Sequence, residues 1–316
     1  MVGVLVNLEK ASGSFFKKNS GYPKFKSKSN NKKAYPIPQL TKINIEGSTI
    51  SIPKFREGIR CNFHRLFKGK IKSSVVIKTP SGKYFISLLV ETGIAEPKLN
   101  PIDESQAIGI DLGIKTFAVL SNGEEIENPK FLRKSLLKLK REQQRLSRKV
   151  KGSKNMVKQR VKLSRTYERV TNQRNDFLHK VTIRMVSQHT TICLEDLNIN
   201  GMLKNHKLAQ ALTDVSIGTF NQMIEYKAKE RGVNIIRIGR FEPSSKMCTC
   251  GVVNKELKLS QRTWTCPNCS TTHDRDLLAA NNIKRFAFLK NNTAGIAGIN
   301  ACGDESLDSP MKQEGA

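Results

Sequence analysis

Four of the seven cysteines lie within 22 residues, and this cluster limits the possible folds more than any other feature of the sequence. They form two pairs, Cys248 with Cys250 and Cys266 with Cys269, and 15 residues separate the pairs. Two thiol pairs at this separation are typical of a zinc ribbon. The first pair is one residue shorter than usual, which strains a tetrahedral site. His273 is a substitute ligand, although a surface or supporting position is favoured for it. Buried free cysteines, the alternative, leave the clustering unexplained.

Acidic residues occur in two strands that are otherwise too apolar to accommodate them. Asp111 and Glu195 each lie in a short apolar strand, and Asp274 and Asp276 come just before a helix. Burying a carboxylate is costly unless it binds a cation or hydrogen-bond donors. Three acids from distant segments suit a two-metal phosphodiesterase, in which Mg²⁺ ions activate water and stabilise the leaving oxygen. A single acid in a strand is also found as an edge residue or a cap, so only the set supports this chemistry.

Positive charge is in large excess, because 55 Lys and Arg against 27 Asp and Glu give a net charge of +28. A polyanion, most simply nucleic acid, would neutralise it. An anionic membrane surface and a lysine-rich proteome are the alternatives. The sequence contains no apolar run of about 18 residues and no signal peptide, so a spanning or secreted protein is not expected. The odd number of cysteines favours a reducing compartment over a disulfide framework. Phosphate-binding loops, nucleophile elbows and a Ser/His/Asp site are not indicated.

The positive charge is concentrated in two segments. Residues 130–184 contain 19 Lys and Arg but 3 Asp and Glu. Their apolar spacing predicts a helical hairpin broken at Gly152 and Ser153, whose outer face, including Arg141, Arg145 and Arg148, contacts phosphates. The predicted core positions are Leu132, Leu136, Leu139, Gln143, Leu146, Val150, Leu163, Tyr167, Val170, Arg174, Phe177 and Val181.

Residues 12–36 form the second basic segment and show no helical or strand periodicity. Lys24, Lys26 and Lys28 alternate there with Tyr22 and Phe25, a combination that suits a phosphate backbone with stacked bases. A solvated loop is the alternative.

The remaining pattern predicts an α/β protein of two domains. Residues 1–104 are expected to form a β-rich, wedge-like nucleic-acid-binding module with a hairpin turn at residues 80–83. Residues 105–290 are expected to form the second domain, with the helical hairpin (128–186) and the zinc ribbon (244–272) inserted. It starts with a meander that carries Asp111 and turns at Asn122-Gly123. A strand at 190–197, a helix at 217–231 ending at Gly232, a strand at 233–238 and a helix at 277–288 follow. Residues 291–316 are expected to be a disordered tail.

Several motifs together resemble those of the transposon-encoded OrfB protein family, TnpB, which is related to type V CRISPR effectors. The resemblance runs from about residue 11 to residue 303. The motifs, in chain order, are Tyr22–Lys28 (YPKFKSK), Ile108–Gly113 (IGIDLG), Asp176–His179 (DFLH), Leu194–Leu197 (LEDL), Pro243–Cys248 (PSSKMC), Cys266–Cys269 (CPNC), His273–Asp276 (HDRD) and Ala294–Gly303 (AGIAGINACG).

The resemblance implies an RNase H-like, RuvC-type nuclease with a nested zinc ribbon, catalytic Mg²⁺ and structural Zn²⁺. Asp111, Glu195 and Asp276 match the catalytic positions, and Asp276 is chosen over Asp274 because the small-residue helix follows it closely. Three departures are present: Leu278 stands where the family has Asn, the first cysteine pair is short, and the chain looks shortened before the Tyr22 segment.

The implied function is RNA-guided, metal-dependent cleavage of double-stranded target DNA beside a short motif, serving a transposable element in a prokaryotic cytoplasm. The partners would be a guide RNA derived from the element's end and the target DNA; pairing with the guide would carry the sequence specificity. An RNA-guided DNA-binding protein that no longer cleaves is one alternative. A DDE-type transposase is another, and a zinc-ribbon nucleic-acid module would leave the strand acids unexplained.

Overall fold

The computed structural model describes residues 2–24, 33–37, 42–44, 48–52, 55–258 and 261–293. The chain divides into two compact units, of which the first comprises Met1–Pro97 with Lys130–Lys180 and the second Lys98–Pro129 with Val181–Ala316. The expected tail after residue 293 lies outside the described residues. None of the described helices is long and apolar enough to cross a membrane.

The first unit contains two three-stranded antiparallel sheets, ordered β1-β5-β6 and β2-β3-β4. The predicted hairpin turn is confirmed, since the Thr79 amide donates to the Lys83 carbonyl over 2.8 Å and Gly82 has a φ of +89°. The elements of the β-rich part are α1 (Val2–Phe16), β1 (Lys33–Ile37), β2 (Lys42–Asn44), β3 (Thr49–Ile52), β4 (Phe55–Arg60), β5 (Lys70–Lys78) and β6 (Tyr84–Glu91).

The expectation that residues 12–36 lack regular structure is wrong at both ends. Helix α1 extends to Phe16, and β1 begins at Lys33 and pairs with β5. The helical spacing of Val4, Leu8, Ala11 and Phe15 is visible only when the pattern is counted from residue 4. Strand β1 is specified by its pairing with a distant strand, which no local pattern records.

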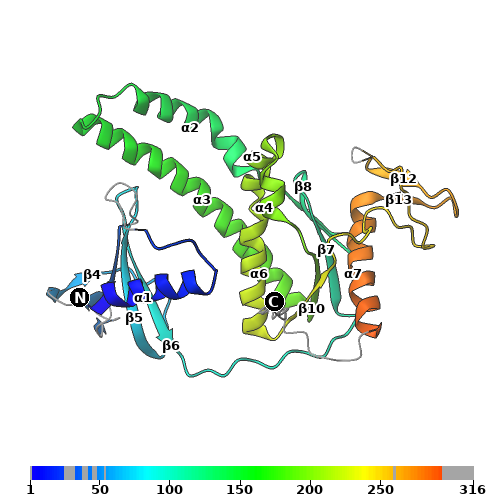
Figure 1. The fold of residues 1–316 in the computed structure, drawn as a ribbon, viewed down its shortest axis with the longest axis horizontal. Helices are drawn as coiled ribbons and strands as arrows, with labels where there is room; N and C mark the ends of the chain where they lie inside the picture. Colours follow the sequence, from blue (N-terminus) through cyan, green and yellow to red (C-terminus); the bar gives the residue numbers. More distant parts are fainter. Residues whose placement is uncertain are drawn as a thin grey trace, which may run out of the picture. The chain divides into compact units, whose positions relative to one another are not determined.

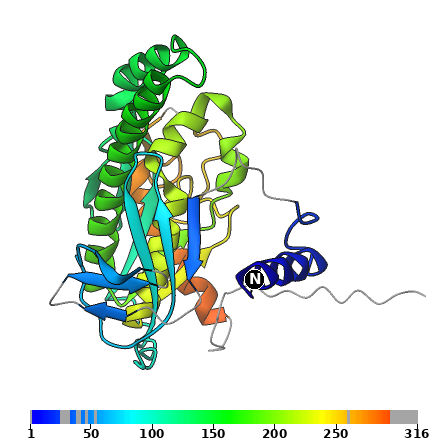
Figure 2. The same ribbon diagram turned by 90° about the vertical axis from the view of Figure 1, so that its left-hand side faces the viewer.

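The helical hairpin of α2 (Phe131–Ser147) and α3 (Lys154–Gln188) is confirmed, and the two helices run side by side in both views (Figures 1 and 2). The break falls where it was predicted, since Gly152 has a φ of +82° and the Ser153 hydroxyl accepts from the Met156 amide. Leu139 and Val170 are buried as expected.

Three predicted core positions of the hairpin, Val150, Gln143 and Tyr167, are wrong because these residues are exposed. Val150 is 77% exposed because it lies in the turn beyond the end of α2. Gln143 is also exposed, and its side-chain amide donates to the Tyr167 hydroxyl over 2.8 Å. A polar residue in a helical slot therefore marks the edge of this helix pair and not its core.

The second unit is built on a five-stranded sheet with the order β11-β10-β7-β8-β9. Strands β7, β8 and β9 form the predicted antiparallel meander, and β10 and β11 add to it in parallel. This arrangement agrees with the expected RNase H-like α/β fold. The elements are β7 (Ala107–Leu112), β8 (Thr116–Leu120), β9 (Glu125–Glu127), β10 (Thr191–Glu195), α4 (Ile199–Leu203), α5 (His206–Val215), α6 (Ile217–Arg231), β11 (Asn234–Ile238), β12 (Thr263–Thr265), β13 (Thr272–Asp274) and α7 (Arg275–Thr293).

Helices α6 and α7 lie on opposite sides of this sheet (Figure 1). The predicted apolar face of α6 is confirmed, because Phe220, Ile224 and Ala228 are at most 1% exposed. Gly232 ends the helix in a left-handed conformation with a φ of +67°. On the other side, Cys193 of β10 packs with Ile283 of α7 in a buried cluster. The sheet is thus covered on both faces, as an almost uninterrupted apolar strand such as β10 requires.

Candidate functional site

Two predicted site acids are brought level by the pairing of parallel strands. Residue Cys193 of β10 is aligned with Gly109 of β7. The paired register ends there, and continuing it by two residues brings Glu195 level with Asp111 on the neighbouring strand. Alternation places Asp111 on the same face as Gly109, and Glu195 on the same face as Cys193. Both carboxylates therefore lie near the ends of neighbouring strands, on the face that α7 covers.

The third acid reaches this place through the close packing of α7 on β7. A Cβ atom added to Gly109 would lie 2.1 Å from the Ala280 carbonyl oxygen, so only glycine allows this approach. Asp276 lies one helical turn before Ala280. The structure thus gathers Asp111, Glu195 and Asp276 at one end of the sheet, although they come from three distant segments.

The electrostatics of Asp111 reflect this gathering. Burial, followed by repulsion from Glu195 and then from Asp276, raises the pKa of Asp111 from 3.8 to about 7. Arg275 and Arg262 oppose the shift. An acid in this position is costly to the fold unless a cation binds, which is the situation that metal ligands share.

Two polar residues that the sequence analysis missed support the acids. The Ser244 hydroxyl donates to the Glu195 carboxylate over 2.5 Å and fixes its orientation. Asn282 is 2% exposed, and its side-chain amide donates to the carbonyls of Ser244 and Met247, each over 2.7 Å. Helix α7 therefore fixes the loop of Ser244 through Asn282, and Ser244 in turn orients Glu195. Ser244 belongs to the Pro243–Cys248 motif, but no local pattern links it to Glu195, which lies 49 residues earlier in the chain.

Asp274 and Asp276 have different surroundings. The Asp274 carboxylate accepts from the backbone amides of Asp276 and Leu277, as the cap of α7. The Asp276 carboxylate instead accepts from the Arg262 guanidinium at both oxygens, over 2.9 and 2.6 Å. Asp196 is exposed and pairs with Arg240, away from Glu195 in strand alternation.

The four cysteines of the predicted ribbon converge. Their sulfurs all lie within 4.8 Å of one another, and no other set of three or more His, Cys, Asp and Glu ligand atoms among the described residues does so. The Cys248 and Cys269 sulfurs are 3.5 Å apart, and those of Cys250 and Cys266 are 3.6 Å apart. Metal–sulfur bonds of 2.3 Å in a tetrahedron require about 3.8 Å. The set fits one ion, and hydrogen bonds with Thr271 lower the pKa of Cys269 to about 6.

The segment with these cysteines, β12 and β13, here called the cysteine ribbon, is joined to α7 by a small apolar cluster. Leu278 is 4% exposed and packs with Cys248, Leu257, Trp264 and Cys266. The residue that departs from the family pattern is thus part of the ribbon's core.

His273 is buried, and its Nε2 lies 3.0 Å from the Cys248 sulfur. A surface position for His273 is therefore wrong, whereas the supporting position agrees with the structure. A histidine beside a thiolate can donate a hydrogen bond to it and so favour its charged, metal-binding form.

The predicted nucleic-acid-binding residues lie in the first unit. Arg141, Arg145 and Arg148 are exposed and share one face of α2 and its end, at spacings of four and three residues. Arg145 also pairs with Glu142 over 3.2 Å. Lys24 is exposed, whereas Lys26 and Lys28 lie outside the described residues.

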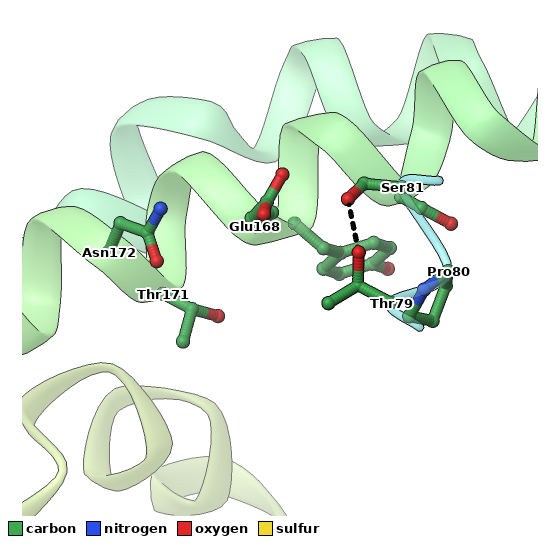
Figure 3. A pocket seen from close by; sticks show the side chains of 8 residues that line it. Thr79, Pro80, Ser81, Glu168, Thr171 and Asn172 are labelled. Carbon is green, nitrogen blue, oxygen red and sulfur yellow. Dashed lines mark hydrogen bonds between the residues drawn. The ribbon is translucent and has the colours of Figure 1, made fainter. Parts of the chain in front are cut away.

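A separate pocket of about 340 Å³ lies within the first unit, between the β5–β6 turn and α3 (Figure 3). Several of its lining residues carry hydroxyl groups, and the Thr79 and Ser81 hydroxyls form a hydrogen bond of 2.7 Å. None of the predicted catalytic residues lines it; the lining residues are Thr79, Pro80, Ser81, Ser164, Tyr167, Glu168, Thr171 and Asn172.

Fold and site together define a class: an RNase H-like α/β protein with three acids at the end of its sheet and a cysteine ribbon directly before the last acid. Two family models match this chain. OrfB_IS605, described as "Probable transposase", matches residues 87–206, and the model "Cas12f1-like, TNB domain" matches residues 218–283.

Relatives match over nearly the whole chain. A protein of Streptomyces pristinaespiralis, named "Putative RNA-guided DNA endonuclease", is 38% identical over 95% of this chain and 72% of its own length. The Escherichia coli K12 protein "Putative RNA-guided DNA endonuclease InsQ" is 32% identical over 98% of this chain and 77% of its own. The chain belongs to the OrfB, or TnpB, family.

Among solved structures, a chain of the Cas12f1-sgRNA-target DNA complex is similar at 21% identity and a TM-score of 0.47. The match covers 68% of this chain and 45% of that chain.

Proposed function

We propose that this protein is an RNA-guided DNA endonuclease of a transposable element, which cleaves target DNA beside a short motif in a metal-dependent reaction. Guide RNA derived from the element's end and double-stranded target DNA are its partners. The names of the relatives from Streptomyces and Escherichia coli support the activity. The net charge of +28 supports a polyanionic partner.

The observation that carries the catalytic assignment is the convergence of Asp111, Glu195 and Asp276 at the end of the sheet. The parallel pairing of β7 with β10, which carry the first two, and the close packing of α7 against Gly109 support this assignment. The set offers oxygen ligands only, which suits Mg²⁺. Bound Mg²⁺ supplies an activated water and stabilises the leaving oxygen of a phosphodiester. Ser244 orients Glu195, and Asp274 fixes the start of the helix that carries Asp276.

The cysteine ribbon holds one Zn²⁺ in a structural role. Four thiols would complete a tetrahedral coordination sphere, so a bound Zn²⁺ would have no position for substrate. Through Leu278 and Asn282 the ribbon supports both the start of α7 and the loop of Ser244. The exposed arginines of α2, with Lys24, Lys26 and Lys28, contact phosphates of the guide or the target.

The test is cleavage of a plasmid target by protein expressed with the native flanking DNA, so that the guide RNA copurifies. Wild type is compared with Asp111→Asn with and without Mg²⁺, and a relative known to cut serves as positive control. We expect Mg²⁺-dependent cutting by wild type and none by the variant. Target binding without cutting by wild type, while the relative cuts, would favour a protein that only binds. Equal cutting by Asp111→Asn would remove the catalytic assignment.

A DDE-type transposase is the second candidate, favoured by the description "Probable transposase" of the matching family model. Both chemistries use clustered acids. A strand-transfer assay separates them: joining of a supplied element end to target DNA supports the transposase, and guide-dependent cutting without joining supports the nuclease.

A further inference from the structure

Arg262 forms an ion pair with Asp276, the last of the three acids. The Arg262 guanidinium contacts both Asp276 carboxylate oxygens, and this ion pair has its shortest N–O distance at 2.6 Å. The Asp276 side chain is 24% exposed and that of Arg262 is 45% exposed, so the arginine is still accessible to a ligand from solution. Both oxygens of the Asp276 carboxylate, which a metal ion would also use, take part in this contact.

The cysteine ribbon places this arginine. Arg262 directly precedes β12, whose Thr263 pairs with Asp274 of β13. Its carbonyl accepts from the Arg275 backbone amide over 2.7 Å, and the Arg275 side chain donates to the neighbouring Gln261 carbonyl over 3.4 Å. The ribbon and the first residue of α7 thus hold Arg262 opposite Asp276 through backbone contacts.

The contact has opposite consequences in the two states of the site. Without a metal ion, three gathered carboxylates repel one another, and a guanidinium offsets part of that charge. With a metal ion, Asp276 must turn its oxygens to the ion, and the guanidinium then competes for the same lone pairs. A guanidinium binds phosphate as well as carboxylate, in the same forked geometry. A DNA phosphate entering the site would therefore offer Arg262 a second partner.

We propose that Arg262 is a positioning residue that occupies Asp276 until a nucleic-acid phosphate takes its place, so that the site binds its metal tightly only when substrate is present. This inference rests on the proposed function. It assigns to the cysteine ribbon a role beyond supporting α7, because the ribbon supplies the competing cation.

The chain offers a matched control in Arg240. This arginine pairs with Asp196 over 2.9 Å and is also 45% exposed, but its partner is not one of the three acids. Replacing either arginine by glutamine removes one positive charge beside the same sheet. A general electrostatic effect on cation binding would appear in both variants, whereas competition for Asp276 appears only in Arg262→Gln.

The experiment measures Mn²⁺ binding to the zinc-loaded full chain by electron paramagnetic resonance, since carboxylate sites accept Mn²⁺. Without nucleic acid, Arg262→Gln should bind Mn²⁺ about 1.5- to fivefold more tightly than wild type, the factor that an ion pair of this exposure supplies. Arg240→Gln should match wild type, and Arg262→Lys should restore most of the wild-type affinity. A single-stranded oligonucleotide should tighten Mn²⁺ binding to wild type and leave Arg262→Gln nearly unchanged.

Equal Mn²⁺ affinities of Arg262→Gln and Arg240→Gln, or an oligonucleotide effect that survives in Arg262→Gln, would overturn the proposal. Asp111→Asn separates this failure from failure of the metal site itself. If Asp111→Asn loses Mn²⁺ binding while Arg262→Gln behaves as wild type, the site stands and only the role of Arg262 is wrong. If Asp111→Asn binds Mn²⁺ as wild type does, the metal site and the proposed function fail together.

Discussion

The cysteine cluster and the acid cluster lie at the two sides of the start of α7, yet they differ in how completely they are formed. The four sulfurs already lie within 4.8 Å of one another, close to the spacing that one tetrahedral ion requires. The three carboxylates are more widely spaced than that, and two of them are held by protein donors, Glu195 by Ser244 and Asp276 by Arg262.

The difference follows from the ligands. The thiols of Cys248 and Cys266 can be packed in a small apolar cluster with Leu278 and Trp264 before an ion arrives. Carboxylates brought equally close repel one another and lose their hydration, as the raised pKa of Asp111 records. A structural site can therefore be prepared by the fold, whereas a catalytic oxygen site is completed by the cation and the substrate. A substitution in one cluster therefore tests whether the other cluster depends on it.

The largest effect is expected from Cys266→Ser, because it breaks the cluster on which the other depends. Loss of a buried thiolate should remove most of the zinc, disorder the cysteine ribbon and release the start of α7, so that cleavage is lost as well. Elemental analysis of zinc together with a cleavage assay checks this. Cys61→Ser, which changes a cysteine outside the cluster, should keep both. Full zinc content in Cys266→Ser would contradict the assignment.

Glu195→Gln and Asp276→Asn should break the acid cluster alone. Each substitution keeps the size of the side chain but removes a charged oxygen ligand, so cleavage should fall below detection while zinc content and DNA binding stay as in wild type. Asp196→Asn is the matched control on the neighbouring residue and should keep most of the activity. A variant of Glu195 or Asp276 that cuts at the wild-type rate would show that its carboxylate is not a ligand.

Ser244→Ala should have an intermediate effect that links the two clusters. The variant removes the donor that orients Glu195, and loss of such a supporting hydrogen bond costs about 10- to 100-fold in metal affinity or activity. The cleavage rate as a function of Mg²⁺ concentration is the measurement. Ser245→Ala, one residue further along the same loop, is the control and should change little. Equal rates for both variants would rule out the supporting role.

The joint variant of Arg141, Arg145 and Arg148, each changed to Gln, should weaken nucleic-acid binding without touching either cluster. Each lost phosphate contact should lower the slope of log affinity against log salt by about 0.7–0.9. Fluorescence anisotropy at several salt concentrations measures the slope, and zinc content should not change. A changed sequence preference at a constant slope would mean that these arginines read bases.

The smallest effect concerns stability against pH in Mg²⁺-free, zinc-loaded protein. The pKa of Asp111 is about 7 in the folded chain, against an ordinary value of 3.8, so the folded state binds more protons between these values. Its contribution to the free energy of unfolding therefore falls as pH rises from about 4 to about 7 and is level above. Asp111→Asn should melt at a higher temperature than wild type at pH 8 and at nearly the same temperature at pH 4. A difference that is independent of pH would contradict the shift.

Much of the framework was predictable because the signals are local. Strand alternation, the Asn122-Gly123 turn, the break at Gly152 and the helix stop at Gly232 are all properties of a few neighbouring residues. The spacing of the four cysteines alone predicts that they form a cluster. The pattern of residues 12–36 alone does not predict helix α1, because its apolar spacing begins at residue 4. It does not predict strand β1 either, because the partner of β1 is distant in the chain.

The arrangement of the acids depends partly on the sequence and partly on the tertiary structure. The sequence by itself determined that Asp111 and Glu195 lie in apolar strands, where a carboxylate needs a cation or donors. Only the tertiary structure decided that Glu195 lies level with Asp111, that Asp274 caps α7 and that Arg262 occupies Asp276. The physical reason is that parallel register, helix packing against Gly109 and a contact between residues 14 positions apart depend on surfaces meeting in space, and short-range periodicity carries no information about them.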